Sequence, residues 1–349
     1  MTESLASQAA VALSNSRLIH DLENLLESFI KSIVTAIDEK SPYTGGHVRR
    51  VSELTMSIAE KMNEVKEGPL AEFCLDEDQL RELRMSAWLH DVGKITTPEH
   101  IIDKAKKLET VCDRIEILKA RFEILKRDFI IEALRRDSIN NDRTCRNDVI
   151  NGYDSYLEEL DKEYEFLVDI NFGDRCLDDM MKDKLNGIST RQWNADGEWR
   201  NLVSSDELHN LSVPLGTLTD EEKEIVRGHV SVTHKMLSQL PFPRKLSRVS
   251  FYASAHHEKI NGTGYPLGLK GNQVPLQARI IALADVFDAL TAKDRPYKKE
   301  RTLSEAVGIM WSMVQADHID ANLFALFLKE RIHLDFAKRE LAPHQVDMV

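Results

Sequence analysis

The chain has 349 residues, 30% of them charged, and a formal net charge of −12. It is long enough for one sizeable domain with additions, and its acidic balance argues against a broad basic surface for duplex nucleic acid. Binding of a small anionic ligand is still compatible with this charge if metal ions and a few basic side chains supply local positive charge. No apolar run approaches the ~20 residues that span a bilayer, and the four scattered cysteines form no CxxC pair, which favours reduced thiols. We expect a cytoplasmic protein without a membrane span.

Residues 1–40 are predicted to form one long helix with an apolar stripe. The stripe has a four-and-three spacing, interrupted by Asn15 and Ser32, and consists of Val11, Leu18, Leu22, Leu25, Phe29 and Ala36. Either a partner helix in a parallel dimer or the chain's own domain would cover it. Residues 4–18 are also similar to the closing helix of a GAF sensory domain. That resemblance implies that this chain is the output part of a longer signalling protein.

Two further helices are predicted before residue 107. Residues 41–46 contain Pro and Gly and break the first helix. The next helix carries apolar residues at helical spacing after His47, namely Val51, Leu54, Ile58 and Met62. A third helix begins at Asp76, a good N-cap, and runs to His90-Asp91, where Gly93 is expected to end it.

Residues 108–213 are predicted to be an inserted helical hairpin. Two four-three apolar repeats, Val111–Phe129 and Leu157–Leu167, flank a polar stretch and predict two amphipathic helices packed against each other. The end of this segment, around Trp193 and Trp199, is expected to be irregular. We expect the insertion to be structural or to form a dimer.

From residue 214 helices are again expected. Thr219 and Glu222 form a capping box ahead of a helix whose inner face includes His229. Val249, Ala253 and His256 share the next face, a glycine-rich loop spans residues 261–271, and Asp285 and Asp288 lie on one face with Ile281. No stretch has a convincing period-two strand pattern, so the fold is predicted to be a mainly α-helical bundle.

Histidines and aspartates recur on the inward faces of these helices. Taken singly, each histidine is best explained as a helix-start, core or surface residue. However, five of the twelve histidines lie on apolar faces beside acidic residues, and burying so many titratable groups without a shared counter-ligand would be costly. The set therefore predicts a metal centre with mixed imidazole and carboxylate ligands. The other seven histidines are interpreted as structural or surface residues.

Three separated motifs carry a resemblance to a known family. They are Trp88–Lys94 with its His90-Asp91 pair, His256-His257 followed by Gly264-Tyr265-Pro266, and Ala284–Leu290 with Asp285. In this order they resemble the HD-GYP family of metal-dependent phosphodiesterases, over roughly residues 38–107 and 214–349. The resemblance implies an HD-type helical bundle. The expected division is a signalling or dimerisation helix (1–40), the first part of the HD-GYP domain (41–107), the insertion (108–213) and the second part (214–349).

The resemblance also implies which residues bind metal. Asp91 matches the bridging carboxylate. His47, His90 and Asp285 match the family's ligands of one ion. His229, His256 and His257 match its ligands of the other ion. Some family members hold a third ion with a glutamate where this chain has Tyr43, so two divalent ions are expected. Iron or manganese fits this set, and zinc, nickel and magnesium stay open.

The reaction that the resemblance implies is hydrolysis of a cyclic dinucleotide, cyclic di-GMP or 3',3'-cyclic GMP-AMP, to a linear dinucleotide. A hydroxide held between the two ions would attack phosphorus, with Asp91 and Lys94 as catalytic residues. Alone, Lys94 is more simply a helix-end lysine, and Asp288 is either a base-edge acceptor or an inward partner of a metal ligand. The expected substrate contacts are Lys94, Tyr265, Asp288, Arg295 and Lys298.

Two loop positions depart from the family pattern. Lys259 replaces an arginine and lacks its bidentate fork, and Asn261 replaces an aspartate; both changes bear on partner binding and base preference. The resemblance further implies a homodimer, through the N-terminal helix or the insertion, and a GGDEF-type partner. The alternatives are a receptor that binds cyclic dinucleotide or proteins without turnover, a general HD phosphohydrolase for nucleoside phosphates, and a coiled-coil adaptor. The adaptor leaves the buried His/Asp set unexplained.

Overall fold

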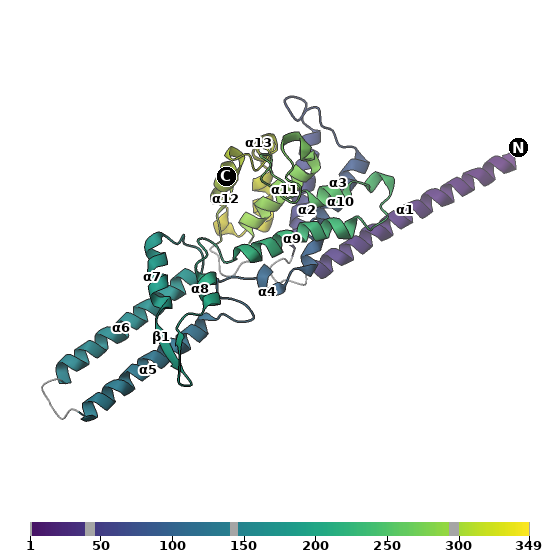
Figure 1. Cartoon of the computed structure of the whole chain (residues 1–349). Coiled ribbons are helices and arrows are strands. Elements are labelled where there is room, and N and C mark those ends of the chain that lie inside the picture. The colour runs from purple at the N-terminus through teal and green to yellow at the C-terminus, as the bar shows by residue number, and fades with distance from the viewer. Residues whose placement is uncertain (1, 39–45, 140–145, 293–299, 349) are drawn as a thin grey trace. The chain divides into compact units, whose positions relative to one another are not determined.

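The computed structural model describes residues 2–38, 46–139, 146–292 and 300–348 (Figure 1). These residues form helices and one two-stranded sheet, so the predicted all-α class is confirmed. The chain divides into two compact units, Met1–Glu99 with Ile225–Val349, and His100–Glu224. The predicted boundaries at residues 108 and 213 fall inside the second unit and stay predictions. None of the described helices has both the length and the apolar character of a segment that crosses a bilayer.

The first unit is a helical bundle, and α9 (Asp220–Leu237) enters it from the second unit. Its other helices are α1 (Thr2–Asp38), α2 (His47–Asn63), α3 (Glu77–Leu89), η1 (Val92–Thr96), η2 (Arg244–Leu246), α10 (Val249–Ser254), η3 (Gly271–Gln273), α11 (Leu276–Thr291), α12 (Leu303–Gln315), α13 (Ala321–Lys329), α14 (Ile332–Glu340) and η4 (Pro343–Gln345).

The centre of this unit is the packing of α2 against α3 and α11. The predicted apolar face of α2 is confirmed, because Val51, Leu54 and Ile58 are buried in one core cluster with Leu83 of α3 and Phe287 of α11. Side chains three or four residues apart lie on one face of a helix, so a single stripe of α2 contacts both neighbours. This packing fixes the N-terminal end of α2 beside α11.

The N-terminus of α3 has the predicted cap. The Asp76 carboxylate accepts a hydrogen bond from the backbone N–H of Gln79 (2.8 Å), and the Gln79 side chain accepts one from the Asp76 N–H (3.0 Å). Two backbone donors of the first turn are therefore satisfied, which starts the helix at a fixed residue.

Helix α1 has two different apolar faces. Leu26, Ile30, Ile33 and Ile37 pack into a core cluster of the first unit, and Arg81 of α3 binds Glu27 at 2.9 Å. The predicted stripe is a separate face and stays exposed, by 57–65% at Val11, Leu18, Leu22, Leu25 and Phe29. The chain's own domain therefore covers one face of α1 and leaves the predicted stripe bare.

The second unit contains the predicted pair of packed helices. Helices α5 and α6 contact each other and bury Leu118, Phe122, Leu160 and Leu167. The first repeat was predicted to begin at Val111, which instead precedes α5 and is 98% exposed. The elements of this unit are α4 (Glu99–Ile102), α5 (Ile115–Ile139), α6 (Arg146–Asn171), α7 (Asp179–Ser189), β1 (Gln192–Ala195), β2 (Glu198–Asn201) and α8 (Ser205–Leu211).

The expectation that the segment around Trp193 and Trp199 is irregular is wrong. Strands β1 and β2 pair antiparallel, with Trp193 opposite Arg200 and Asn194 opposite Trp199. Asp196 and Gly197 form the turn with φ of 54° and 87°. An Asp-Gly pair supplies the two positive φ angles that a tight hairpin turn needs, so the signal was present in the sequence.

Buried lysines hold the ends of the second unit together. The Lys104 ammonium contacts both carboxylate oxygens of Glu222 at 2.8 Å. The Lys107 ammonium donates hydrogen bonds to the carbonyl oxygens of Leu211 (3.1 Å) and Val213 (2.7 Å). Burial lowers the pKa of Lys107 to about 8. Residues around 104–107 and 211–222 are therefore joined by charge-assisted contacts.

Gly93 does not end α3 as predicted. The helix ends at Leu89, and Gly93 lies within η1, where its N–H donates to the hydroxyl of Thr233 on α9 (3.0 Å). A β-carbon at Gly93 would lie 2.0 Å from the carbonyl oxygen of His229. Glycine is needed here because the two backbones approach too closely for any side chain.

A Gly93→Ala substitution is expected to destabilise the protein by about 1–3 kcal/mol, because the methyl group forces η1 away from α9. Urea unfolding of the metal-free protein measures the change. Gly308→Ala is the matched control, since nothing lies within 4 Å of a β-carbon there; it is expected to stabilise α12 by about 0.5–1 kcal/mol. Equal effects of the two substitutions would contradict the close approach.

Candidate metal centre

Five segments of the first unit bring the predicted metal ligands together. His47 is the first residue of α2, His90 and Asp91 lie between α3 and η1, and His229 lies on α9. The remaining ligands are His256 and His257, directly after α10, and Asp285 on α11. Potential donor atoms lie within 4.8 Å of one another in three sets, His47/His90/Asp285, His229/His256/His257 and His90/Asp91/His256.

The carboxylate of Asp91 lies between two groups of rings. Its Oδ2 is 3.5 Å from His47 Nε2 and 3.3 Å from His90 Nε2. Its Oδ1 is 3.3 Å from His229 Nε2. The two oxygens therefore face different histidines, which is the arrangement that a carboxylate bridging two cations needs.

The histidine nitrogens that face Asp91 are buried polar atoms that lack hydrogen bonds. Among the described residues, Nε2 of His47, His90, His229 and His256 and Oδ1 of Asp91 are buried without a hydrogen-bond partner. His90 and Asp91 are only 0% and 3% exposed. Leaving such atoms unsatisfied is costly, whereas imidazole nitrogen and carboxylate oxygen are good ligands for divalent transition metals. The donor set therefore fits metal ions.

The acidic side chains of the cluster are held ionised. Burial opposes ionisation of Asp91, yet the adjacent ammonium of Lys94 and the contacts with the surrounding histidine rings outweigh it and hold the pKa of the carboxyl well below its ordinary value. Burial likewise opposes ionisation of Asp285, but hydrogen bonding to His47 lowers its pKa strongly. Ionised carboxylates are the forms that bind metal.

The histidines differ in charge. Burial lowers the pKa of His47, but contacts with Asp285, Asp288 and Asp91 outweigh it, so this pKa is raised well above 6.5. Burial lowers the pKa of His256 far below its ordinary value and that of His257 to about 4. His256 and His257 are therefore neutral and ready to bind metal near pH 7, whereas His47 must release a proton first.

Two of the predicted substrate contacts are occupied by protein partners. The Lys94 ammonium lies 2.5 Å from Asp91 Oδ2, beside the cluster and with its side chain 26% exposed. Asp288 is 1% exposed and contacts His47 and Arg50. That geometry favours its role as partner of a metal ligand over contact with a base. Arg295 and Lys298, and likewise Tyr43, lie outside the described residues.

The ring of Tyr265 lies against the cluster. It stacks on His257 with centroids 4.9 Å apart, and the Arg227 guanidinium lies 5.7 Å from its centroid. Gly264 beside it is required, since a β-carbon there would lie 2.4 Å from the backbone nitrogen of Lys259. The loop thus brings an aromatic face and a cation to the edge of the metal site.

Buried side chains fix the shape of this loop. Glu258 is 4% exposed, and its carboxylate accepts hydrogen bonds from the N–H groups of Leu267 (2.6 Å) and Leu269 (2.8 Å). Asn261 donates its amide to the carbonyl of Ala316 (2.8 Å), which the aspartate usual in the family could not do. Sequence reasoning missed Glu258 and Arg50 as supports of the site, although both are charged residues within three positions of a predicted ligand.

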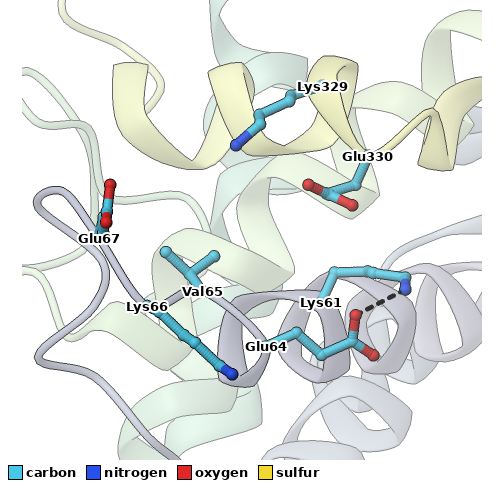
Figure 2. A pocket seen from close by; sticks show the side chains of 7 residues that line it. All are labelled: Lys61, Glu64, Val65, Lys66, Glu67, Lys329 and Glu330. Atoms are coloured by element: carbon cyan, nitrogen blue, oxygen red, sulfur yellow. Dashed lines mark hydrogen bonds and ion pairs between the residues drawn. The ribbon is translucent and has the colours of Figure 1, made fainter.

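A separate hollow of about 350 Å³ lies at the C-terminal ends of α2 and α13 (Figure 2). Its walls are mostly charged and include Lys66, Lys329 and the Lys61–Glu64 ion pair at 2.8 Å. Lys61 lies 14 residues after His47 on α2, so about 20 Å of helix separate the hollow from the metal ligands. The hollow is not part of the candidate centre.

The chain matches two family models, each described as an HD domain, over residues 44–164 and 204–323. It is 38% identical over 132 residues to the 3'3'-cGAMP-specific phosphodiesterase 3 of Vibrio cholerae, covering 38% of this chain and 27% of the relative. It is 42% identical over 91 residues to a cyclic di-GMP phosphodiesterase of Thermotoga maritima, covering 26% and 24%.

A further relative is the cyclic di-GMP phosphodiesterase response regulator RpfG of Xanthomonas campestris, 39% identical over 97 residues that cover 28% of this chain and 25% of the relative. The matched part thus spans about a quarter of each of these relatives. The two HD domain matches enclose all seven predicted metal ligands. Together with the phosphodiesterase relatives, they show that this chain belongs to the HD domain family and is of the HD-GYP type.

Proposed function

We propose that this chain is a metal-dependent phosphodiesterase that opens a cyclic dinucleotide to a linear dinucleotide. The observation that carries the proposal is the buried cluster, in which Asp91 directs one oxygen to His47 and His90 and the other to His229. Its donors fit two divalent ions, one held by His47, His90 and Asp285 and the other by His229, His256 and His257, with Asp91 between them. Iron or manganese suits this mixture of nitrogen and oxygen ligands.

When bound, such ions polarise a phosphoryl oxygen and lower the pKa of water towards neutrality. The protein supplies position and charge. Asp91 keeps the two halves of the centre together, and Lys94, anchored on Asp91 at 2.5 Å, lies where its ammonium would contact the scissile phosphate. A cation beside the reacting phosphate stabilises the negative charge that develops there. Tyr265 and Arg227 would contact the base or the second phosphate.

The substrate class is proposed from chemistry and from the relatives together. A ring with two phosphates is a compact dianion that suits a cationic, metal-lined site in an otherwise acidic chain. The relatives include enzymes named for cyclic di-GMP and for 3'3'-cGAMP, so both rings are candidates. Binding of a GGDEF-type partner stays a prediction. Cys74, Cys112 and Cys176 are free cysteines at exposed positions, and the cytoplasmic location stays a prediction.

Replacement of Asp91 by alanine is expected to remove both metal binding and hydrolysis. The substitution deletes the only carboxylate placed between the two sets of histidines in the described residues, and metal catalysis is worth several kcal/mol, so turnover should fall by about 10³-fold or more. Elemental analysis measures metal per chain, and chromatography of the products measures hydrolysis of cyclic di-GMP, 3',3'-cyclic GMP-AMP and cyclic di-AMP.

The parent protein is expected to hold about two ions per chain and to open at least one of the rings. Binding of a cyclic dinucleotide without turnover, with iron or manganese loaded, would favour the receptor function. Parent protein that holds no metal after loading would contradict both the metal centre and the enzyme.

The stability of the metal-free protein should depend on pH through His257. Its pKa is about 4 in the folded protein, against the ordinary histidine value of 6.5, so the folded state favours the neutral ring. The resulting stability is complete above pH 6.5 and is lost as the pH falls towards 4, by about 3 kcal/mol. His47 does not change the stability between pH 6.5 and 4, because its pKa is raised and its titration in the folded protein therefore lies above pH 6.5.

A His257→Gln variant is therefore expected to lose less stability than the parent between pH 6.5 and 4.5, as followed by urea unfolding after removal of metal. The matched control is His100→Gln, which removes an exposed histidine and should leave the pH dependence of the parent's stability in place. An unchanged slope in His257→Gln would mean that the ring is not held neutral by burial.

We also propose that the bare stripe of α1 pairs with the same stripe of a second copy in a parallel dimer. The stripe keeps its four-and-three spacing from Val11 to Phe29 while a different face of α1 packs on the domain. Asn15 interrupts the stripe at a position where a polar residue commonly selects a parallel two-stranded coiled coil. The insertion is the alternative dimer contact.

The double substitution Leu22→Glu, Leu25→Glu is expected to convert a dimer into a monomer, because it buries like charges in the helix pair. Leu13→Glu is the control: Leu13 is 72% exposed, but at ~100° per residue it lies on the far side of α1. Sedimentation at tens of micromolar protein measures the state. A doubly substituted chain that stays dimeric would place the contact in the insertion instead.

A further inference from the structure

Three histidines of the metal centre are oriented by their own helices. His90, His229 and His256 each donate from Nδ1 to the carbonyl oxygen three residues earlier, at 2.7, 2.5 and 2.6 Å. Because a carbonyl oxygen only accepts, Nδ1 must carry the proton, and Nε2 then has a free lone pair that faces the cluster. The preceding turn of chain thus selects the tautomer that binds metal.

His47 is oriented differently. It is the first residue of α2, so no helical turn of α2 precedes it to supply a carbonyl. Its Nδ1 instead lies 2.7 Å from Oδ2 of Asp288, on α11 and 241 positions later in the chain. A carboxylate in this place fixes the ring and increases the basicity of the opposite nitrogen more than a carbonyl does.

Arg50 fixes the carboxylate in turn. Its Nε is 2.6 Å from Asp288 Oδ1 and its Nη2 is 3.2 Å from Oδ2, and the two side chains are 13% and 1% exposed. A two-point contact of this kind sets the plane of a carboxylate as well as its position. Arg50 lies three residues after His47, so the first turn of α2 carries both the ligand and the residue that holds its partner.

We propose that Asp288, clamped by Arg50, is the positioning residue that presents His47 Nε2 to a metal ion and selectively strengthens the His47–His90–Asp285 site. The inference rests on the proposed two-metal centre and adds an asymmetry to it. The histidines of the His229–His256–His257 site have carbonyl or aromatic partners, whereas the His47 site has a carboxylate behind its histidine. Asp288 is accordingly not a contact for the substrate base.

The substitution Asp288→Asn would keep the shape of the side chain and lose its ability to accept hydrogen bonds from both partners. Asp288 accepts from His47 through Oδ2 and from Arg50 Nε through Oδ1. An asparagine has one accepting oxygen and one donating amide. Whichever way it turns, an amide N–H faces either the His47 ring N–H or the Arg50 guanidinium, so one of the two contacts becomes repulsive.

The test is titration of the metal-free full chain with Mn²⁺, comparing the parent with Asp288→Asn and Arg50→Gln. The parent is expected to bind two ions per chain. In Asp288→Asn one ion should bind about 10–100-fold more weakly, while the affinity of the other stays within about threefold. Arg50→Gln should weaken the same ion by a smaller factor, because the carboxylate stays but loses its clamp.

Asp320→Asn is the matched control. Asp320 is also a partly buried partner of an arginine, with the Arg279 guanidinium of α11 at 2.9 Å and the Arg279 and Asp320 side chains 15% and 11% exposed. It is expected to lower the unfolding midpoint and leave both Mn²⁺ affinities unchanged. A merely structural role of Asp288 would give this same result, so thermal unfolding of every metal-free variant is measured in parallel.

Each contrary outcome has one meaning. A parent chain that binds no Mn²⁺ refutes the proposed metal centre itself. If the parent binds two ions, equal affinities in the parent and Asp288→Asn overturn the positioning role and leave the metal centre standing. Loss of both ions in equal measure from Asp288→Asn, or the same loss from Asp320→Asn, also overturns it, because the effect would then be general destabilisation.

Discussion

The carboxylate of Asp91 is buried among histidine rings, and the surrounding helices are arranged so that this burial is tolerable. A buried ionised group needs opposite charge and hydrogen bonds. Asp91 has the ammonium of Lys94 at 2.5 Å on one oxygen and His229 Nε2 at 3.3 Å from the other. The atoms of this cluster that lack hydrogen bonds are Oδ1 of Asp91 and Nε2 of His47, His90, His229 and His256, so a shared cation is the natural partner for all of them.

The packing of the helical bundle brings the residues of this cluster together. The ligands come from the start of α2, the junction of α3 and η1, the middle of α9, the end of α10 and the middle of α11. Several of these points place the polar residue on an otherwise apolar helix face, as with Asp285, which lies four residues after the buried Ile281 on α11. Gly93 allows η1 to approach the backbone of α9, which brings Asp91 to His229. Small steric changes in the backbone next to the ligands should therefore disturb the centre.

Much of the bundle and of the candidate metal centre could be predicted from the sequence, because helical periodicity indicates which residues face inward. Val51, Leu54 and Ile58 predicted the buried face of α2, and the histidines and aspartates of the separated motifs were expected to meet and do so in the structure. Whether they bind metal stays a prediction. Periodicity also predicted the apolar stripe of α1. It could not show that a neighbouring face of α1, with Ile30 and Ile37, is the one that packs on the domain.

The rest depended on contacts that local pattern does not contain. Asp288 meets Arg50 and His47 across more than two hundred residues, so its role as partner of a ligand could be named only as one of two alternatives. Gly93 was interpreted as a helix end because that is the usual local reason for glycine, whereas its real constraint is the carbonyl of His229. The β1–β2 hairpin was missed because its four-residue strands are too short for an alternating pattern, although Asp196-Gly197 signals the turn.

Anomalous X-ray diffraction from crystals of the manganese-loaded chain would test the central claim most directly. The account predicts two peaks about 3.5–4 Å apart, with Asp91 touching both and the rings of His47, His90, His229 and His256 approaching through Nε2. Rings that bind through Nδ1, a single peak that Asp91 does not touch, or no peak among these residues would contradict it.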